Sequence, residues 1–186
     1  MVGPEIFGSK VNLRPLKTDD LTRRIAWLGD PECARFFTGS LPQRTYGMED
    51  AEGWRRSLEA DLTASVWAIE TKDGRHIGDI DLHDIDRYQG SAKLTILIGD
   101  KDYWGRGYGT DAVKCLLASA FADLKLQRVN LRVYDFNGRA IRCYEKCGFE
   151  RAYDTGSQGA YPGEMHMVAS KDRFMAMGLN AGTVSA

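Results

Sequence analysis

Hydrophobic residues recur at two spacings along the chain, and the change from one to the other separates strands from helices. Short runs rich in Val, Ile and Leu, and stretches that alternate with polar residues, predict strands. Turn-like segments at 72–75 and 87–90 join three of these runs, and such short connections make neighbouring strands antiparallel. The predicted strands run from Val11 to the residue before Pro15 and over residues 66–71, 77–85, 92–98, 129–134, 149–154 and 164–170.

Helical spacing is clearest after the central strands, where apolar residues over 112–124 follow a helical period. An earlier helix is expected at 18–28, which opens on helix-start residues. Another is expected at 48–62, although Gly53 weakens it by about 1 kcal/mol relative to alanine. A short helix at 138–147 is expected to stop at a glycine. Together these elements predict an α+β fold, in which helices flank a mixed sheet.

Length and charge narrow the class of protein. The 186 residues suit a single domain over 1–186, with a core at about 10–175 and a tail that frays from residue 178. The net charge is −1 and both signs are mixed along the chain, which argues against a nucleic-acid partner. The richest apolar stretch, 112–122, is too short to span a membrane. The N-terminus lacks the layout of a signal peptide, so we expect a cytoplasmic location.

Two of the four cysteines, Cys143 and Cys147, lie four residues apart, which places both thiols on one face of a helix. A zinc site needs further Cys or His ligands, and none is near them in the sequence. We therefore expect no metal, and we expect the cysteines to pack as small hydrophobic residues.

A glycine-rich turn joins a predicted strand to the strongest predicted helix. Gly105, Gly107 and Gly109 let the backbone approach a ligand closely, and Arg106 adds a positive charge. The amides of this turn and of the first helical turn form a natural site for a phosphate or diphosphate. A ligand-free turn is the plainer interpretation.

A Rossmann dinucleotide site is a further alternative, because residues 107–112 satisfy the pattern G-x-G-x-x-A. That pattern requires a repeating βαβ context, and the segment before it is an antiparallel meander. A P-loop is excluded because no Gly-Lys-Ser/Thr follows.

Two motifs in the correct order carry a resemblance to a known family. The run Tyr103-Trp-Gly-Arg-Gly-Tyr-Gly-Thr110 resembles the acetyl-CoA signature Q/R-x-x-G-x-G/A of the GNAT N-acetyltransferases. The run Asn137-Gly-Arg-Ala-Ile-Arg-Cys-Tyr-Glu-Lys-Cys-Gly-Phe149 is similar to the family's second motif, N-x-x-A-x-x-x-Y-x-x-x-G-F. Trp104 replaces the usual Gln or Arg, which resembles the RimJ/RimL-like branch, as does the segment 28–36. The resemblance covers about residues 10 to 170.

The resemblance implies the GNAT fold, a twisted mixed sheet of six to seven strands in which the fourth and fifth strands, here 92–99 and 128–134, separate. It further implies that the pantetheine arm of acetyl-CoA lies in this gap, with the diphosphate on the amides of 106–110. Tyr144 matches the general acid of the family, which protonates the leaving thiolate, although it could instead only pack. Asn137 is expected beside the cofactor, as a helix cap, or as both. The expected cofactor contacts are Leu97, Ile98, Trp104, Gly105, Arg106, Gly107, Tyr108, Gly109, Thr110 and Asn137.

The base that deprotonates the amine is not where many relatives have it. They carry a Glu early in the fourth strand, and this chain has Lys93 there. Asp79, Asp81 and His83 alternate onto one face of the preceding strand and are the replacement candidates, together with water.

The pKa of the acceptor amine sets how much a base matters. At pH 7 about one-tenth of an α-amine is free base, against about 1 in 2,500 of a lysine-like amine. The missing Glu therefore favours a protein N-terminal α-amine over a small-molecule amine, with both classes open.

Two other functions remain as alternatives on the sequence alone. One is a non-catalytic acyl-CoA-binding or regulatory module on the same fold, and the other is an NAD(P)-dependent oxidoreductase. Tyr144 favours an enzyme, because a pure binder has no use for its hydroxyl. The expected partners are acetyl-CoA and an amine, with no nucleic acid and no membrane. Homodimers occur among the relatives, so a homodimer is a candidate assembly.

Overall fold

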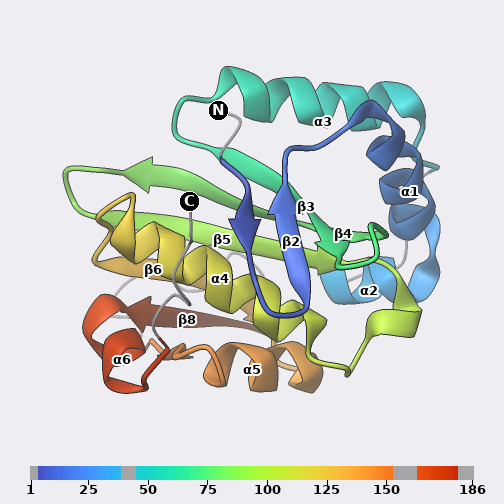
Figure 1. Cartoon of the computed structure of the whole chain (residues 1–186). Helices are drawn as coiled ribbons and strands as arrows, with labels where there is room; N and C mark the ends of the chain where they lie inside the picture. The colour runs from blue at the N-terminus through green and yellow to red at the C-terminus, as the bar shows by residue number, and fades with distance from the viewer. Residues whose placement is uncertain (1–3, 39–44, 153–162, 180–186) are drawn as a thin grey trace.

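The centre of the computed structural model is one twisted, mixed sheet, which the structure describes together with its helices over residues 4–38, 45–152 and 163–179 (Figure 1). Its eight strands lie in the order β1-β2-β3-β4-β5-β6-β8-β7. All neighbours are antiparallel except β5 and β6. The strands are β1 (Ile6–Phe7), β2 (Val11–Arg14), β3 (Ser65–Thr71), β4 (His76–Asp86), β5 (Ser91–Ile98), β6 (Arg128–Tyr134), β7 (Glu150–Arg151) and β8 (Glu164–Ser170).

Six α-helices and one 3₁₀ turn are described around this sheet. They are α1 (Thr18–Gly29), α2 (Pro31–Thr38), α3 (Met48–Ala60), η1 (Lys101–Tyr103), α4 (Tyr108–Ala122), α5 (Gly138–Glu145) and α6 (Lys171–Ala176). None of the described helices is long and apolar enough to cross a membrane.

The α+β class and the antiparallel meander of β3, β4 and β5 are confirmed. The sheet has eight strands instead of six to seven because β1, an edge strand of two residues, was not predicted. A strand this short carries no periodicity. The strand expected at 149–154 is present as β7, which spans Glu150–Arg151, and residues 153 and 154 lie outside the described residues. Helix α3 ends at Ala60, so Leu62 lies beyond it and is 81% exposed, against the expected helix at 48–62. The loop expected at 156–163 and the tail expected from 178 lie outside the described residues, apart from Gly163, Gly178 and Leu179.

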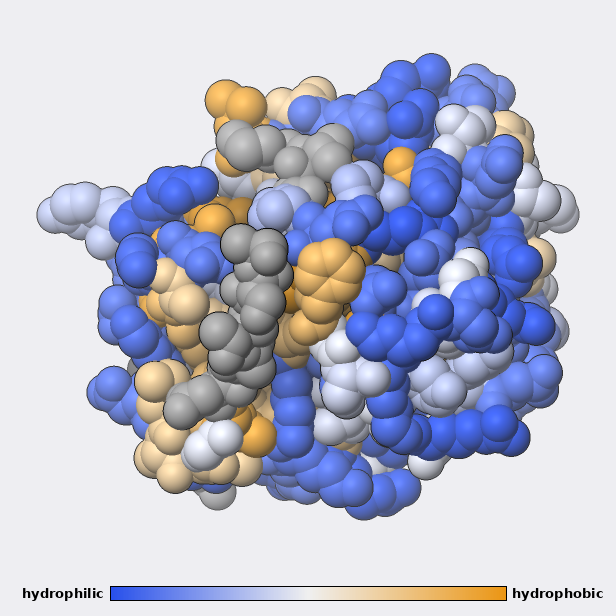
Figure 2. Space-filling view, viewed as in Figure 1, coloured by the Kyte–Doolittle hydropathy of each residue, from blue (hydrophilic) through white to orange (hydrophobic). Residues whose placement is uncertain are grey.

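Helix α4 covers one face of the sheet, while α1, α2 and α3 lie around the other (Figure 1). The alternation along the strands sets this division, because successive side chains point to opposite faces. Figure 2 shows a surface on the α4 side that is mostly hydrophilic, with hydrophobic residues gathered mainly in its left-hand half. The main core between sheet and helix includes Ile80, Leu82, Leu94, Val113, Leu116, Leu117, Phe121 and Leu131.

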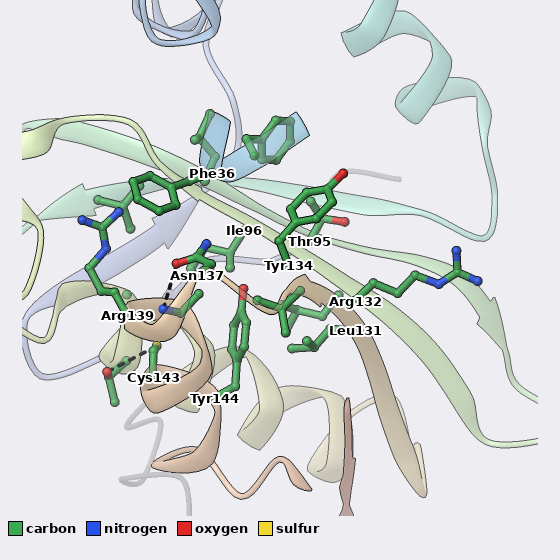
Figure 3. Close-up of a pocket in the computed structure, with 18 of the residues that line it drawn as sticks. Phe36, Thr95, Ile96, Leu131, Arg132, Tyr134, Asn137, Arg139, Cys143 and Tyr144 are labelled. Carbon is green, nitrogen blue, oxygen red and sulfur yellow. Dashed lines mark hydrogen bonds between the residues drawn. The ribbon is translucent and has the colours of Figure 1, made fainter. Parts of the chain in front are cut away.

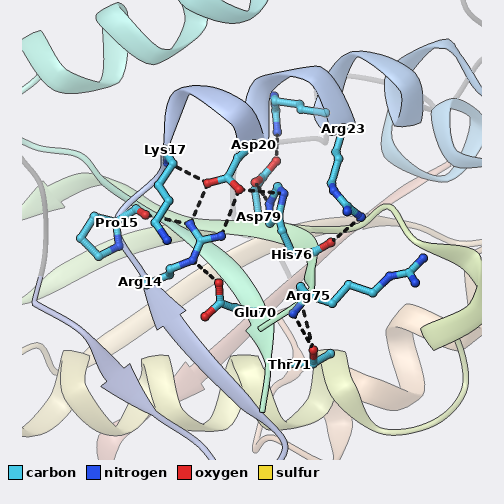
Figure 4. Close-up of polar contacts among 11 residues, drawn as sticks. Arg14, Pro15, Lys17, Asp20, Arg23, Glu70, Thr71, Arg75, His76 and Asp79 are labelled. Carbon is cyan, nitrogen blue, oxygen red and sulfur yellow. Dashed lines mark hydrogen bonds and ion pairs between the residues drawn. The ribbon is translucent and has the colours of Figure 1, made fainter. Parts of the chain in front are cut away.

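A buried ionic network joins α1 to the sheet (Figure 4). Arg14 on β2 binds both oxygens of Asp20, at 2.7 and 3.0 Å, and also contacts Glu70. The Asp20 carboxylate accepts the Lys17 amide at 2.7 Å as well, which caps the start of α1. Burial opposes ionisation of Asp20, but the hydrogen bonds from Arg14 and Lys17 outweigh it and lower the pKa of the carboxyl group.

The network continues from Asp20 toward β4. Nδ1 of His76 faces an oxygen of Asp20 at 3.3 Å, and its Nε2 contacts Asp79 at 3.0 Å. Arg24 on α1 binds the other oxygen of Asp79 at 2.7 Å. Each carboxylate in this chain of contacts therefore has a cationic or imidazole partner, which buried charges require.

We predict that Asp20→Asn lowers the free energy of unfolding by about 3 to 5 kcal/mol near pH 7, because it leaves Arg14 short of a buried partner. The pKa of Asp20 is lowered in the native protein, so its contribution is present above the unfolded value of about 3.9 and disappears as pH falls through the native value. Urea unfolding at neutral and acid pH measures both the cost and its loss.

Asp19→Asn is the matched control, because Asp19 is exposed in the same helical turn. It should lower stability by at most about 1 kcal/mol, through the helix dipole alone. Equal effects of the two substitutions would show that the buried network adds nothing.

Candidate active site between two separating strands

Strands β5 and β6 begin side by side and then separate. They pair only at Ser91–Lys93 with Arg128–Asn130. Beyond these pairs, residues 94–98 and 131–134 form the two walls of a cleft of about 1020 Å³, which we call the main cleft. The separation expected between these two strands is therefore present, and it leaves backbone groups on both walls without a strand partner.

The register of β5 against β4 decides which backbone groups face the main cleft. The Gly99 amide donates to the Ile77 carbonyl at 3.0 Å, so odd-numbered residues of this strand turn their N–H and C=O toward β4. Even-numbered residues turn theirs toward the cleft. The Ile98 carbonyl is occupied, because the Trp104 indole donates to it at 2.6 Å. Among the described residues, Ile96, rather than Leu97, is therefore the residue whose N–H and C=O both point to the cleft without a strand partner, while Leu97 lines the cleft with its side chain.

The glycine-rich turn lies at the open end of the main cleft. Gly105 and Gly107 have φ of 73° and 86°, a left-handed conformation that favours glycine, and Gly107 is the N-cap of α4. Within the described residues, none of the six successive amides from 105 to 110 donates a hydrogen bond. Successive unpaired amides at a helix N-terminus form a strong site for an anion.

The turn between β1 and β2 supports this loop from a segment about 100 residues away. Lys10 donates its ammonium group to the Arg106 carbonyl at 2.9 Å and so brings a positive charge to the loop. The Asp111 carboxylate accepts the amides of Ser9, Lys10 and Val11 at 3.1, 2.7 and 3.0 Å, which fixes the start of α4. Sequence reasoning missed Lys10, and no local pattern links it to the glycines.

Most of the residues expected to bind the cofactor line the main cleft. They are Leu97, Ile98, Trp104, Gly105, Gly107, Gly109, Thr110 and Asn137. Arg106 and Tyr108 do not line it. The Tyr108 ring packs edge-on against Tyr103, with 4.9 Å between ring centroids, and Arg106 is exposed.

Tyr144 and Asn137 enter the cleft from α5 and its N-cap. Figure 3 shows the Tyr144 ring extending from the helix into the cleft, with its hydroxyl at the far end. The side chain is 7% exposed, and burial raises the pKa of its hydroxyl above the ordinary value. The side-chain oxygen Oδ1 of Asn137 accepts a hydrogen bond from the Ala140 amide at 3.1 Å. Asn137 therefore caps α5, and it also lines the cleft.

The two neighbouring cysteines link α5 to α4. The Thr110 hydroxyl donates to the Cys143 sulfur at 3.3 Å, and the Cys147 thiol donates to the Thr110 carbonyl at 3.5 Å. The neighbouring Cys147 thiol lowers the pKa of Cys143, against the effect of burial. No group of three or more His, Cys, Asp or Glu side chains that could hold a metal occurs in the described ranges.

A smaller pocket of about 220 Å³, which we call the side pocket, lies on the α1–α3 side of the sheet. Its walls come from α1, α2, α3, β4 and β5. They are Arg24, Phe37, Trp54, Leu58, Asp79, Asp81, His83, Thr95 and Leu97. Four of these residues, Phe37, His83, Thr95 and Leu97, also line the main cleft. The two spaces therefore meet along the same stretch of β4 and β5.

The three candidate bases share this pocket, as their alternation on β4 predicts. Asp79 is engaged by Arg24 and His76, and it is buried. Asp81 accepts from the ring of His83, with 2.8 Å between Oδ1 and Nδ1. Lys93, at the position where the resemblance led us to expect a Glu, forms an exposed ion pair with Asp84 at 2.7 Å.

We predict that Gly107→Ala and Gly109→Ala have opposite effects on stability. Alanine at 107 must adopt a left-handed conformation, which costs about 1 to 2 kcal/mol. Alanine at 109 lies in the first turn of α4, where its Cβ makes ordinary contacts from 3.4 Å outward and helix propensity favours it by about 0.5 to 1 kcal/mol. Urea unfolding of the two variants tests this, and equal stabilities would contradict the left-handed assignment of Gly107.

Residues 10–150 match the family model described as the acetyltransferase (GNAT) domain. The chain is 34% identical over 143 residues to the SPbeta prophage-derived uncharacterised N-acetyltransferase YokL of Bacillus subtilis, which covers 76% of this chain and 77% of that protein. It is 26% identical over 170 residues to the spermidine N(1)-acetyltransferase of Escherichia coli, covering 89% of each. The chain spans only 28% of an uncharacterised protein of Methanocaldococcus jannaschii that it also matches.

Solved structures agree with the fold. The crystal structure of spermidine N-acetyltransferase from Vibrio cholerae in complex with CoA and spermine superimposes with a TM-score of 0.75 at 21% identity, over 90% of this chain and 99% of that one. The family model covers most of the chain and the relatives match across most of its length. The chain therefore belongs to the GNAT acetyltransferase family, and it is an N-acetyltransferase that uses acetyl-CoA as its acetyl donor.

Proposed function

We propose that this enzyme acetylates a primary amine of a small molecule, and that residues 1–186 act as one catalytic domain with a core at about 10–175. The observation that carries the proposal is the side pocket, which meets the main cleft at four shared residues. At about 220 Å³ it suits a short amine better than a folded protein surface. The amine and the thioester thus approach each other from two directions.

Acetyl-CoA fits the main cleft with its diphosphate at the glycine-rich turn. The unpaired amides of 105–110 and the ammonium group of Lys10 supply the positive potential for it. From Ile98 back to Lys93, β5 runs about 16 Å at about 3.3 Å per residue, a span similar to that of an extended pantetheine arm. The pantetheine amides find their partners in Ile96, whose N–H and C=O face the gap, and the thioester then lies near the closed end of the cleft.

The reaction is a direct attack in a ternary complex. The amine nitrogen forms a bond to the thioester carbonyl carbon, and a backbone N–H of the separated strand stabilises the resulting oxyanion. The C–S bond then breaks, and the Tyr144 hydroxyl donates its proton to the departing thiolate. Burial keeps this hydroxyl protonated at neutral pH, which a general acid requires.

A small-molecule acceptor is favoured over a protein N-terminus by two observations. Two of the relatives described above are spermidine acetyltransferases, and one of them matches over 89% of this chain. The preference for an α-amine rested on the lack of a base, and the pair formed by His83 and Asp81 removes that reason. We also propose assignment to the RimJ/RimL-like branch, because Trp104 stands where the usual signature has Gln or Arg.

We predict that the purified enzyme releases CoA thiol when acetyl-CoA is mixed with short primary amines, including spermidine and linear diamines. Peptides with a free N-terminus should give rates near the amine-free background, because they do not enter a pocket of about 220 Å³. A thiol-reactive dye follows the reaction and mass spectrometry identifies the acetylated product. Turnover of peptides alone would contradict a small-molecule acceptor.

We predict that Tyr144→Phe lowers kcat by about 10²-fold or more, because the leaving thiolate loses its proton donor. The dissociation constant of CoA should stay within about a factor of two, since the ring and its packing remain. Isothermal titration with CoA and steady-state kinetics measure the two effects separately.

Tyr88→Phe is the control for this substitution, because Tyr88 is fully exposed on the turn between β4 and β5. It should change neither kcat nor CoA binding. An unchanged kcat in the Tyr144 variant would remove that hydroxyl from the mechanism.

A further inference from the structure

We propose that His83, oriented by Asp81, is the general base that takes the proton from the attacking amine. The inference rests on the proposed function and names the residue that performs its remaining step. It assigns to a strand next to β5 the task that many relatives give to a Glu on β5 itself.

The position of His83 is the first argument. It lines both the main cleft and the side pocket, so it faces the thioester and the amine together. On the sheet it lies opposite Lys93, whose partner Asn130 is the last residue of β6 to pair before the strands separate. The imidazole therefore stands at the closed end of the cleft, where the proposed path of the pantetheine arm ends.

The contact with Asp81 is the second argument. The two residues are two apart on one strand, so they share a face, and 2.8 Å separates His83 Nδ1 from the Asp81 carboxylate. Because a carboxylate accepts, Nδ1 carries the hydrogen and Nε2 carries the lone pair. Among the described residues, no hydrogen bond engages Nε2. The ring is thus held in the tautomer that a base needs, with its free nitrogen available to substrate.

The neighbouring groups are less suited to this role. Asp79 is bound by Arg24 and His76, and neutralising it would break the buried network that holds α1 to the sheet. Lys93 is cationic and paired with Asp84. Asp81 is only 15% exposed at its side chain, against 33% for His83, so the imidazole is the better exposed member of the pair.

The charges around His83 set the pH at which it works. Asp81 and Asp84 lie on its own strand, Lys93 comes from β5, and Asp61 comes from the turn after α3. The hydrogen bond to Asp81 raises the pKa of His83, mainly opposed by burial. A raised pKa means that the neutral, active form is reached only above the ordinary value of about 6.5. The pH profile of kcat/KM should therefore have an acid limb above about pH 6.5, and kcat/KM should fall as the pH drops through it.

The proton balance is complete with this assignment. As the C–N bond forms, an N–H proton of the amine passes to Nε2 of His83. As the C–S bond breaks, the Tyr144 hydroxyl gives its proton to sulfur. Solvent then returns a proton to Tyr144 and takes one from His83. The products are the N-acetyl amine and CoA thiol, and both side chains are restored.

The test compares His83→Gln and Asp81→Asn with the wild-type enzyme in pH profiles of kcat/KM, using acetyl-CoA and the best amine of the panel. His83→Gln should lower the plateau by about 10²-fold and abolish the acid limb, while CoA binds as before. Asp81→Asn should lower the plateau and move the limb to lower pH, because the contact that raises the pKa of His83 is lost. If His83 and Asp81 were purely structural, both variants would keep the acid limb at its wild-type pH.

A further variant separates loss of the base from loss of folding. His83→Ala should recover part of its rate when imidazole is added to the buffer, since a free base then fills the space. Asp73→Asn, at an exposed turn, is the control and should leave the profile unchanged. Thermal unfolding confirms that each variant is folded.

The outcomes distinguish the two levels of the argument. A wild-type enzyme that acetylates no amine overturns the proposed function and the inference with it. An active wild type, with a His83→Gln variant that keeps both the plateau and the acid limb, overturns the inference alone. Loss of the limb in Asp79→Asn, with His83→Gln unaffected, would transfer the role to Asp79.

Discussion

Backbone N–H and C=O groups that leave a sheet must find other partners, and β5 and β6 create that demand at the centre of this protein. The two strands pair over three residues each and then separate. An unpaired buried peptide group costs about as much as a lost hydrogen bond, so the walls of the gap favour any ligand that offers amide groups of its own. Pantetheine has two amides, and the proposed placement of its arm in the gap therefore follows from backbone geometry before any side chain contributes.

Aromatic side chains bridge the gap at its open end. The Phe36 ring on α2 lies edge-on to Trp104, with 5.9 Å between ring centroids, and its centroid is 6.2 Å from that of Phe136. Trp104 follows β5 and Phe136 follows β6, so Phe36 contacts residues beyond both separated strands. The Tyr134 hydroxyl donates to the Thr38 carbonyl at 2.9 Å, which ties the end of α2 to β6. Helix α2 thus connects both walls, and beyond the three paired residues its contacts help to set the position of β6 relative to β5.

Local patterns were enough to predict much of the fold. The meander, α4 and α5 follow from hydrophobic periodicity and short turns, and the two glycine- and asparagine-containing motifs identified the family. The sequence was less informative about α2, because its eight residues are too few to show a clear helical period, although Asp30 and Pro31 separate it from α1.

Details that depend on register or on distant segments were out of reach. The backbone groups of either Ile96 or Leu97 point to the gap, depending on whether the odd- or even-numbered residues of β5 bond to β4. A shift of one residue in this register would exchange the two. The contact of Lys10 with the loop at 106 joins positions 96 residues apart, and no periodicity encodes it. The partners of Asp79 and Asp81 were equally hidden, because both are aspartates on the same face and only the packing of α1 distinguishes them.

The environment of the side pocket also bears on the protonation of the acceptor. A histidine that accepts a proton directly from a lysine-like ammonium works against several pKa units, each about 1.4 kcal/mol, so the amine must become neutral before or as it binds. Burial against Trp54 and Phe37 favours this change, because it lowers the pKa of an amine. Arg24 adds little to this effect, since it is paired with Asp79 at 2.7 Å, and the Asp81 carboxylate in the same pocket acts in the opposite direction. The site thus divides the problem, since burial shifts the acceptor toward its free base and the imidazole removes the second proton only as the new bond forms.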